Sequence, residues 1–158
     1  MQALLEGDYQ LDSRMMLHVE VERHGRRVYE NDALNDIVIA KGTAFRVVRV
    51  GISADGEEVT RFNGDGVIAA TPTGSTAYSL SAGGPVVEPT ARNFIVSPIC
   101  AHSVHANAYV LSPERVITVQ TEKNSYKPVL LSVDGGRAFS LRSGDSIEVR
   151  RSKFDTKL

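Results

Sequence analysis

Residues 17–22 read LHVEVE, an unbroken alternation of apolar and polar side chains. Successive side chains of a β-strand point to opposite faces, so the three apolar side chains would share a buried face and the three polar ones would face water. The same period of two, with turn residues between the runs, recurs along most of the chain, whereas helical periodicity is scarce. The sequence therefore predicts a mainly β fold.

Glycine-containing turns join the predicted strands. Asp55-Gly56 and Asp134-Gly135 are the strongest of these signals, because a type I′ turn needs positive φ and glycine adopts it at little cost. A further turn is predicted at residues 23–27, around Gly25. Beyond the first hairpin, the predicted strands cover residues 37–40, 45–52, 59–62, 67–70, 129–133, 138–141 and 146–151.

One stretch, residues 75–82, has the composition of a helix, and it ends at the helix-stopping sequence Gly83-Gly84-Pro85. The expected architecture is a multi-stranded β-sandwich of antiparallel layers with one short helix. A length of 158 residues suits a single domain with a sizeable core.

Charge and cysteine content exclude several classes of protein. Lysine and arginine together number 18 and aspartate and glutamate 19, so the formal net charge of −1 creates no field that would attract nucleic acid or an anionic membrane. The single cysteine, Cys100, cannot form an internal disulfide. No run approaches the roughly 18 apolar residues that span a bilayer. We expect a cytoplasmic protein without a nucleic-acid or membrane partner.

The most unusual segment, residues 64–79, reads GDGVIAATPTGSTAYS. It predicts a buried strand followed by a hydroxyl-rich loop that leads into a helix amino end, where unpaired amides favour anions. Small residues let a ligand approach the backbone, and Tyr78 offers an aromatic face. The alternative is that Thr73 or Ser75 only caps the helix and Tyr78 lies in the core. The residues alone leave both interpretations open.

This segment carries a resemblance to a known family. Residues 65–85 resemble, almost letter for letter, the signature of the NAD kinases, which phosphorylate the 2′-hydroxyl of the adenosine ribose of NAD to give NADP. Residues 33–39 resemble the family's second motif, an asparagine followed by an acidic residue on a strand. Weaker matches bring the similarity to essentially the whole chain; they cover residues 7–17, 99–103 and 131–135. The implied fold is the carboxy-terminal domain of a two-domain kinase.

The resemblance implies a role for each matched residue. Asn35 and Asp36 would grip the adenosine half of NAD, and Asp65 would contact the nicotinamide end. Arg46 would reach phosphate charge across a subunit boundary, and a neighbouring subunit would contribute Cys100 near the nicotinamide. The loop enclosing the adenosine would supply the other substrate-binding residues, Thr73, Thr76, Ala77, Tyr78, Ser79, Leu80 and Ser81.

Each of these assignments has a structural alternative. Asn35-Asp36 could be a turn-forming pair, Arg46 an exposed strand arginine, and Cys100 a buried inert thiol. His102 and His105 have a spacing that suits a metal pair, but without further ligands nearby we interpret them as structural. His18 and His24 are assigned no role.

The family's Gly-Gly-Asp-Gly motif, which carries the catalytic aspartate in an amino-terminal α/β domain, does not occur in residues 1–158. Phosphoryl transfer needs that base positioned against the phosphates. We therefore expect residues 1–158 to be the carboxy-terminal β domain of a longer kinase, without the amino-terminal domain and the final tail, to contain no catalytic residue, and to be inactive alone. Asn63 and Gly136 also depart from the family pattern.

The resemblance implies NAD, NADP and either ATP or inorganic polyphosphate as ligands, with a divalent cation, expected to be Mg²⁺, on the donor phosphates. It also implies a homo-oligomer, a dimer or a tetramer. Two other functions compete with this one: a non-catalytic NAD(P)-binding or assembly module, and a lipid kinase of the diacylglycerol or sphingosine type. A lipid hydroxyl would not require the adenosine-enclosing loop.

Overall fold

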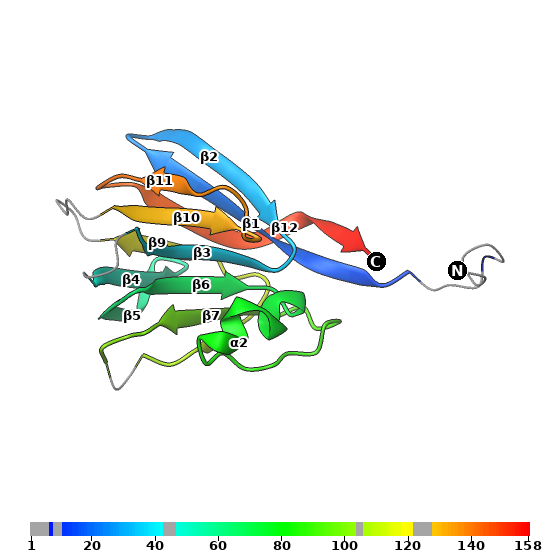
Figure 1. Cartoon of the computed structure of the whole chain (residues 1–158). Coiled ribbons are helices and arrows are strands. Elements are labelled where there is room, and N and C mark those ends of the chain that lie inside the picture. The colour runs from blue at the N-terminus through cyan, green and yellow to red at the C-terminus, as the bar shows by residue number, and fades with distance from the viewer. Residues whose placement is uncertain (1–6, 8–10, 43–46, 104–105, 122–127) are drawn as a thin grey trace.

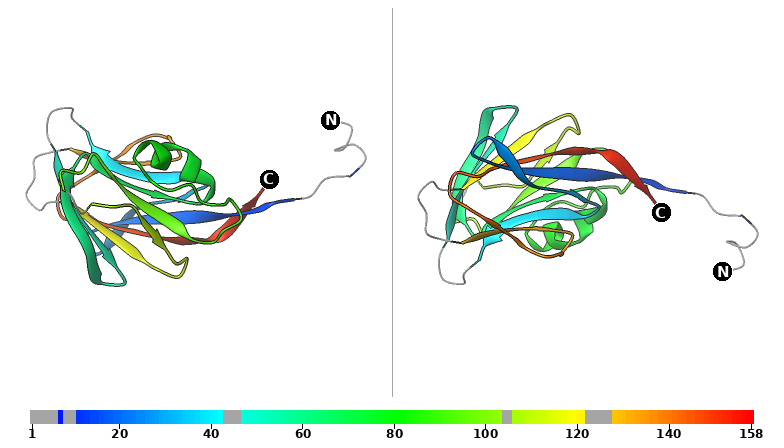
Figure 2. Two further views of the ribbon diagram at one scale, coloured as in Figure 1. Left: turned by 90° about the horizontal axis from the view of Figure 1, so that it is seen from below. Right: turned by 90° about the horizontal axis from the view of Figure 1, so that it is seen from above.

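A computed structural model describes residues 7, 11–42, 47–103, 106–121 and 128–158. It confirms a mainly β fold in which two six-stranded antiparallel sheets form a sandwich, as Figures 1 and 2 show. Sheet 1 has the order β2 (Arg26–Ala33), β1 (Ser13–Arg23), β12 (Ser146–Lys157), β9 (Ile117–Thr121), β4 (Val48–Ala54) and β5 (Glu57–Gly64). Sheet 2 has the order β11 (Phe139–Leu141), β10 (Val129–Val133), β3 (Asp36–Lys41), β6 (Gly66–Ala70), β7 (Phe94–Ile99) and β8 (Tyr109–Leu111).

The alternation in residues 17–22 has the predicted consequence. Leu17, Val19 and Val21 are fully buried in the core between the sheets, while the polar side chains of β1 lie on the outer face of sheet 1. β1 pairs along most of its length with β12 on one side and with β2 on the other. β12 extends to Lys157, beyond the end predicted for the last strand.

The predicted turns are also present. His24-Gly25, Asp55-Gly56 and Asp134-Gly135 connect β1 to β2, β4 to β5 and β10 to β11, and both residues of each pair have positive φ. This is the backbone conformation that a type I′ hairpin turn requires.

β6 is buried on both of its faces. Val67 and Ala69 belong to the core between the sheets, whereas Ile68 and Ala70 belong to a second apolar cluster on the outer face of sheet 2, together with Ala82 and other partly buried side chains. The segment that follows β6 folds back over this outer face (Figure 2). A strand covered on both faces reads as a continuous apolar run, as residues 67–70 do.

The one short helix expected in this region is confirmed, but residues 75–82 do not form a single helix. The chain forms a 3₁₀ turn at Thr73–Thr76 and a short helix, α2, at Tyr78–Ser81, separated by Ala77 with φ −92° and ψ −132°. The Ser75 hydroxyl accepts from the Val87 N–H at 3.1 Å and donates to the Val87 carbonyl at 3.2 Å, so it braces the loop. The non-helical backbone of Ala77 interrupts the hydrogen-bond pattern that a single helix would need. In the described part of the chain, no helix is long and apolar enough to cross a membrane.

An ion pair joins the end of β1 to the turn that precedes β12. Arg23 donates two hydrogen bonds of 2.7 Å to the buried carboxylate of Asp145, which also accepts from the Arg142 N–H at 2.8 Å. Burial raises the pKa of Asp145, but the bonds from Arg23 and Arg142 outweigh it and hold that pKa below its usual value. The ionised form of Asp145 therefore stabilises the fold.

We predict that Asp145→Asn lowers the free energy of unfolding by about 2 kcal/mol at neutral pH, because it leaves Arg23 without its charged partner. A depressed folded pKa contributes stability above the unfolded pKa of about 4 that disappears as pH falls through the folded value. Urea unfolding should therefore show that the parent has a larger free energy of unfolding than Asp145→Asn at pH 7, and that this difference becomes smaller in acid. Glu57→Gln, at the exposed first residue of β5, is the control, and a stability difference independent of pH would contradict the assignment.

Candidate functional site

The loop after β6 is tied to the segment that precedes β3. β3 and β6 are paired so that Asp36 lies opposite Ala70, which brings Asn35 next to Thr71. The Thr71 N–H donates to the Asn35 carbonyl at 2.9 Å. The Thr71 hydroxyl donates to the Leu34 carbonyl at 2.5 Å and accepts from the Gly74 N–H at 3.0 Å. Thr71 thus holds both sides of the candidate adenosine site together.

Gly74 lets the loop lie directly on the Asn35 backbone. A Cβ atom at position 74 would lie 2.0 Å from the Asn35 carbonyl oxygen and 2.7 Å from its Cα. Rigid backbone occupies that space, so a larger residue would separate the loop from Asn35. The glycine of the TGSTAY sequence is therefore required for close packing.

Asp134, in the β10–β11 turn, positions the other side of the site. One carboxylate oxygen accepts from the Leu34 N–H at 2.8 Å, and the other accepts from the N–H groups of Asn35 and Asp36 at 2.8 and 3.0 Å. The Asp134 N–H in turn donates to the Asp36 carbonyl at 2.9 Å. The sequence identified residue 134 as a turn aspartate within a weak family match, and no local signal indicates that its partners lie about a hundred positions earlier.

The family motif places the Asn35-Asp36 pair on a strand, but only Asp36 belongs to one. Asn35 is half-buried and precedes the strand, and Asp36 is the first residue of β3. Burial raises the pKa of the Asp36 carboxyl above its usual value, and the negative charge of Asp134 adds to that increase. A buried carboxyl with a raised pKa beside an open loop is typical of a binding site.

The exposed part of the loop presents an aromatic ring and small side chains. Tyr78 is 46% exposed, which excludes the alternative that places it in the core. Thr73 forms no cap, and its hydroxyl is buried and unpartnered among the described residues. Ser79 is buried, with its hydroxyl 3.1 Å from that of Ser97. The other loop candidates lie on the exposed side; they are Thr76, Ala77, Leu80 and Ser81.

Asp65 and Cys100 lie at the opposite end of β6. Gly66 pairs with Ile99, so Asp65 and Cys100 share that end, and Asp65 lies about 20 Å along the strand from the start of the candidate adenosine loop at Thr71, at a rise of about 3.4 Å per residue. Asp65 forms an ion pair with Lys41 at 2.6 Å. Cys100 is exposed, so the interpretation as a buried thiol is wrong. Arg46 and His105 lie outside the described residues.

Fold and loop geometry together define a β-sandwich with a hydroxyl-lined, small-residue candidate ligand loop at one end of a sheet. The family model for the ATP-NAD kinase C-terminal domain matches residues 34–158, and the chain belongs to this family. The NAD kinase of Natranaerobius thermophilus is 39% identical over 158 residues, which is 100% of this chain and 55% of that protein. The NAD kinase of Symbiobacterium thermophilum is 44% identical over 155 residues, 98% of this chain and 54% of that protein.

Solved structures share the fold. A yeast NADH kinase complexed with NADH has a TM-score of 0.86 and 34% identity, covering 96% of this chain and 44% of that chain. An NAD kinase from Archaeoglobus fulgidus in complex with ATP has a TM-score of 0.78 and 31% identity, covering 99% of this chain and 57% of that chain. The chain spans about half the length of the curated relatives it matches.

We predict that Asp134→Gly loosens the Leu34–Asp36 segment, because glycine keeps the positive φ of residue 134 but removes all three carboxylate hydrogen bonds. The free energy needed to open this segment locally should fall by about 1–2 kcal/mol, which corresponds to roughly tenfold faster hydrogen exchange at these amides. Asp134→Asn can keep the oxygen that accepts from Asn35 and Asp36, so its exchange rate should lie between those of the parent and Asp134→Gly. Asp55→Gly is the matched control in the other Asp-Gly turn, and unchanged exchange at residues 34–36 in Asp134→Gly would refute the prediction.

Proposed function

We propose that this chain is the carboxy-terminal domain of an NAD kinase, which transfers a phosphoryl group to the 2′-hydroxyl of the adenosine ribose of NAD to give NADP. The observation that carries the proposal is the Asn35-Asp36 corner held beneath the TGSTAY loop by Thr71 and Asp134. The similarity of the whole chain to NAD kinases supports the same reaction.

In this proposal, each group at the corner has a task that suits its chemistry. The Asn35 amide pairs with an adenine edge, and the Asp36 carboxyl accepts from ribose hydroxyls. The exposed Tyr78 ring packs on the adenosine. The Thr73 hydroxyl, unpartnered among the described residues, gains a hydrogen bond when the ligand is present.

The ends of β6 support an oligomeric enzyme. Asp65 and Cys100 lie at the end of sheet 2 remote from the Asn35 corner, so we assign them to the nicotinamide end of a site completed by a neighbouring subunit. Arg46 belongs to the same proposal as a group that reaches phosphate across that boundary. The chain would then act as a homodimer or homotetramer.

ATP or inorganic polyphosphate is the proposed donor, with Mg²⁺ held mainly by the donor phosphates. The complexes of relatives with NADH and with ATP support nucleotide ligands of this kind. The catalytic aspartate would belong to a segment outside these 158 residues, since they contain no Gly-Gly-Asp-Gly motif. We also propose a cytoplasmic location, in keeping with the single unpaired cysteine.

The missing motif also favours a second candidate, a module that binds NAD or NADP without catalysis. Both candidates require the Asn35 corner, but only the kinase requires a catalytic segment joined to it. Recovering the coding sequence upstream of residue 1 separates them, because a Gly-Gly-Asp-Gly motif in that frame supports the enzyme. A chimaera separates them functionally.

We predict that this chain forms no NADP alone but does so when it replaces the matching carboxy-terminal region of the Natranaerobius thermophilus NAD kinase. In that chimaera, Asn35→Ala and Tyr78→Ala should each weaken NAD binding at least tenfold, measured by calorimetry, or about 1.4 kcal/mol. The exposed controls are Asn93→Ala, which removes another asparagine, and Phe154→Ala, which removes another aromatic ring. Circular dichroism establishes folding. A folded chimaera that binds no NAD, or equal binding by all four variants, would exclude the proposed site.

A further inference from the structure

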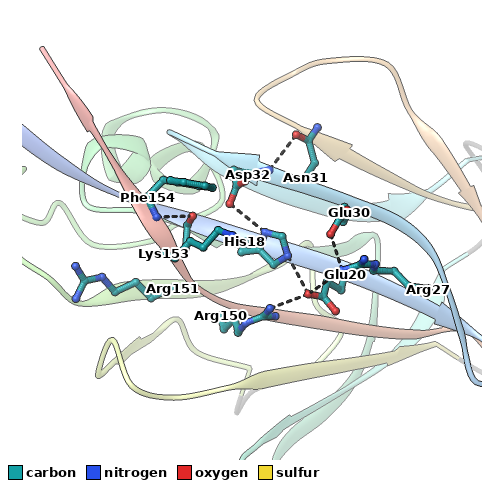
Figure 3. Close-up of a pocket in the computed structure, with 11 residues that line it drawn as sticks. His18, Glu20, Arg27, Glu30, Asn31, Asp32, Arg150, Arg151, Lys153 and Phe154 are labelled. Atoms are coloured by element: carbon teal, nitrogen blue, oxygen red, sulfur yellow. Dashed lines mark hydrogen bonds and ion pairs between the residues drawn. The ribbon is translucent and has the colours of Figure 1, made fainter.

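The outer face of sheet 1 carries a group of metal-ligating side chains (Figure 3), whereas the candidate nucleotide loop follows β6 of sheet 2. We propose that His18, Glu20 and Glu30 bind a divalent transition-metal ion such as Zn²⁺. One ligand atom from each, an imidazole nitrogen and two carboxylate oxygens, lies within 4.8 Å of the other two. Among the described residues, no other group of three or more histidine, cysteine, aspartate or glutamate side chains is close enough together to hold one metal ion.

Strand register brings the three ligands together. His18 and Glu20 alternate onto the same outer face of β1, and Glu30 of β2 is the direct partner of Glu20. Asp32 of β2 is likewise the direct partner of His18. Directly opposed side chains on antiparallel strands have Cβ atoms about 5 Å apart, a spacing that suits a shared ion.

Both ring nitrogens of His18 contact carboxylates, and one of these contacts suits a metal-binding histidine. Its Nδ1 lies 3.0 Å from an Asp32 carboxylate oxygen, and its Nε2 lies 3.0 Å from a Glu20 carboxylate oxygen. A metal-binding histidine usually donates its other ring N–H to a carboxylate, which fixes the tautomer and the ring orientation. If Asp32 keeps the Nδ1–H, Nε2 can exchange its contact with Glu20 for a bond to the ion. A histidine with two carboxylates is a ligand set that Zn²⁺ accepts, leaving a fourth position for water.

The local charges favour an additional cation. Glu20 lies directly opposite Glu30 on one side and Glu148 of β12 on the other, and like charges in such positions repel. Arg27 bonds Glu30 and Arg150 bonds Glu20, both at 2.7 Å.

With Asp32 included, the group has four carboxylates and the two guanidinium groups of Arg27 and Arg150, an excess of two negative charges. The carboxylates are those of Glu20, Glu30, Asp32 and Glu148. Lys153, whose ammonium lies 4.9 Å from the centre of the Phe154 ring, also lines the groove and reduces the excess to one. Arg151 lines it too, but pairs with Asp155. A divalent ion would more than offset this remaining negative charge.

The volume of the groove and the exposure of the Glu30 side chain allow the ligands to approach an ion more closely. Ligand atoms in a tetrahedral zinc site lie about 3.4 Å apart, given bonds of about 2.1 Å. The Glu30 side chain is 50% exposed, so a rotamer change can bring its carboxylate closer to His18. The groove has a volume of about 730 Å³, which leaves room for coordinating water.

The ion would tie β2, the edge strand of sheet 1, to β1. Binding to the folded state alone raises stability by mass action, so Zn²⁺ should raise the Tm. The proposed NAD site lies on sheet 2 and shares no residue with this group. The metal site therefore stands independently of the kinase proposal.

We would titrate ZnCl₂ into the chelator-stripped chain by calorimetry, and would follow the visible absorption of bound Co²⁺ as a second measure. We expect one ion per chain, with affinity lowered at least tenfold by His18→Ala or Glu30→Gln and by 10- to 100-fold by Asp32→Asn, which removes the orienting carboxylate. Glu58→Gln and His102→Gln, exposed and outside the group, should bind as the parent chain does.

MgCl₂ in place of ZnCl₂ should raise the Tm far less, because Mg²⁺ prefers a full shell of oxygen ligands. The half-exposed Glu30 tolerates substitution, so Glu30→Gln decides the result if His18→Ala fails to fold. Binding of Zn²⁺ or Co²⁺ that persists undiminished in both of these variants, or a parent chain that binds neither ion, would overturn the proposal.

Discussion

The burial of β6 on both faces is the constraint on which the rest of the structure depends. Val67 and Ala69 fill the core between the sheets, so the strand must lie at the centre of sheet 2 between β3 and β7. Ile68 and Ala70 on its other face must also be covered, and the chain achieves this by folding its own next segment back over them. The ligand loop is the element that completes this burial, so its position follows from the core.

That position creates the candidate nucleotide-binding corner. With the loop held over β6, Gly74 contacts the Asn35 backbone and Thr71 supplies hydrogen bonds to Leu34 and Asn35. The amides of the same segment are satisfied by Asp134 from a third part of the chain. Three distant segments thus meet in a corner with few free backbone groups, which gives the exposed Tyr78 and the buried Asp36 defined positions.

The two sheets present different chemistry on their outer faces. Sheet 2 is covered by its loop and offers hydroxyls and an aromatic ring to a ligand. Sheet 1 leaves its polar face open, and the register of β1 with β2 and β12 concentrates carboxylates around His18. The antiparallel register decides both results, because it determines which side chains stand directly opposite each other.

The sequence by itself determined the strand alternation of residues 17–22, the three Gly-containing turns and the family resemblance, because these depend on side-chain period and local backbone preference. Only the tertiary structure decided that Asp134 binds the Asn35 segment, that Asp65 and Cys100 share one end of sheet 2, and that Cys100 is exposed. It also split the expected helix at Ala77 and surrounded His18 with carboxylates. The physical reason is that these environments come from strand pairing between segments far apart in the chain, and the local pattern leaves the register of that pairing open.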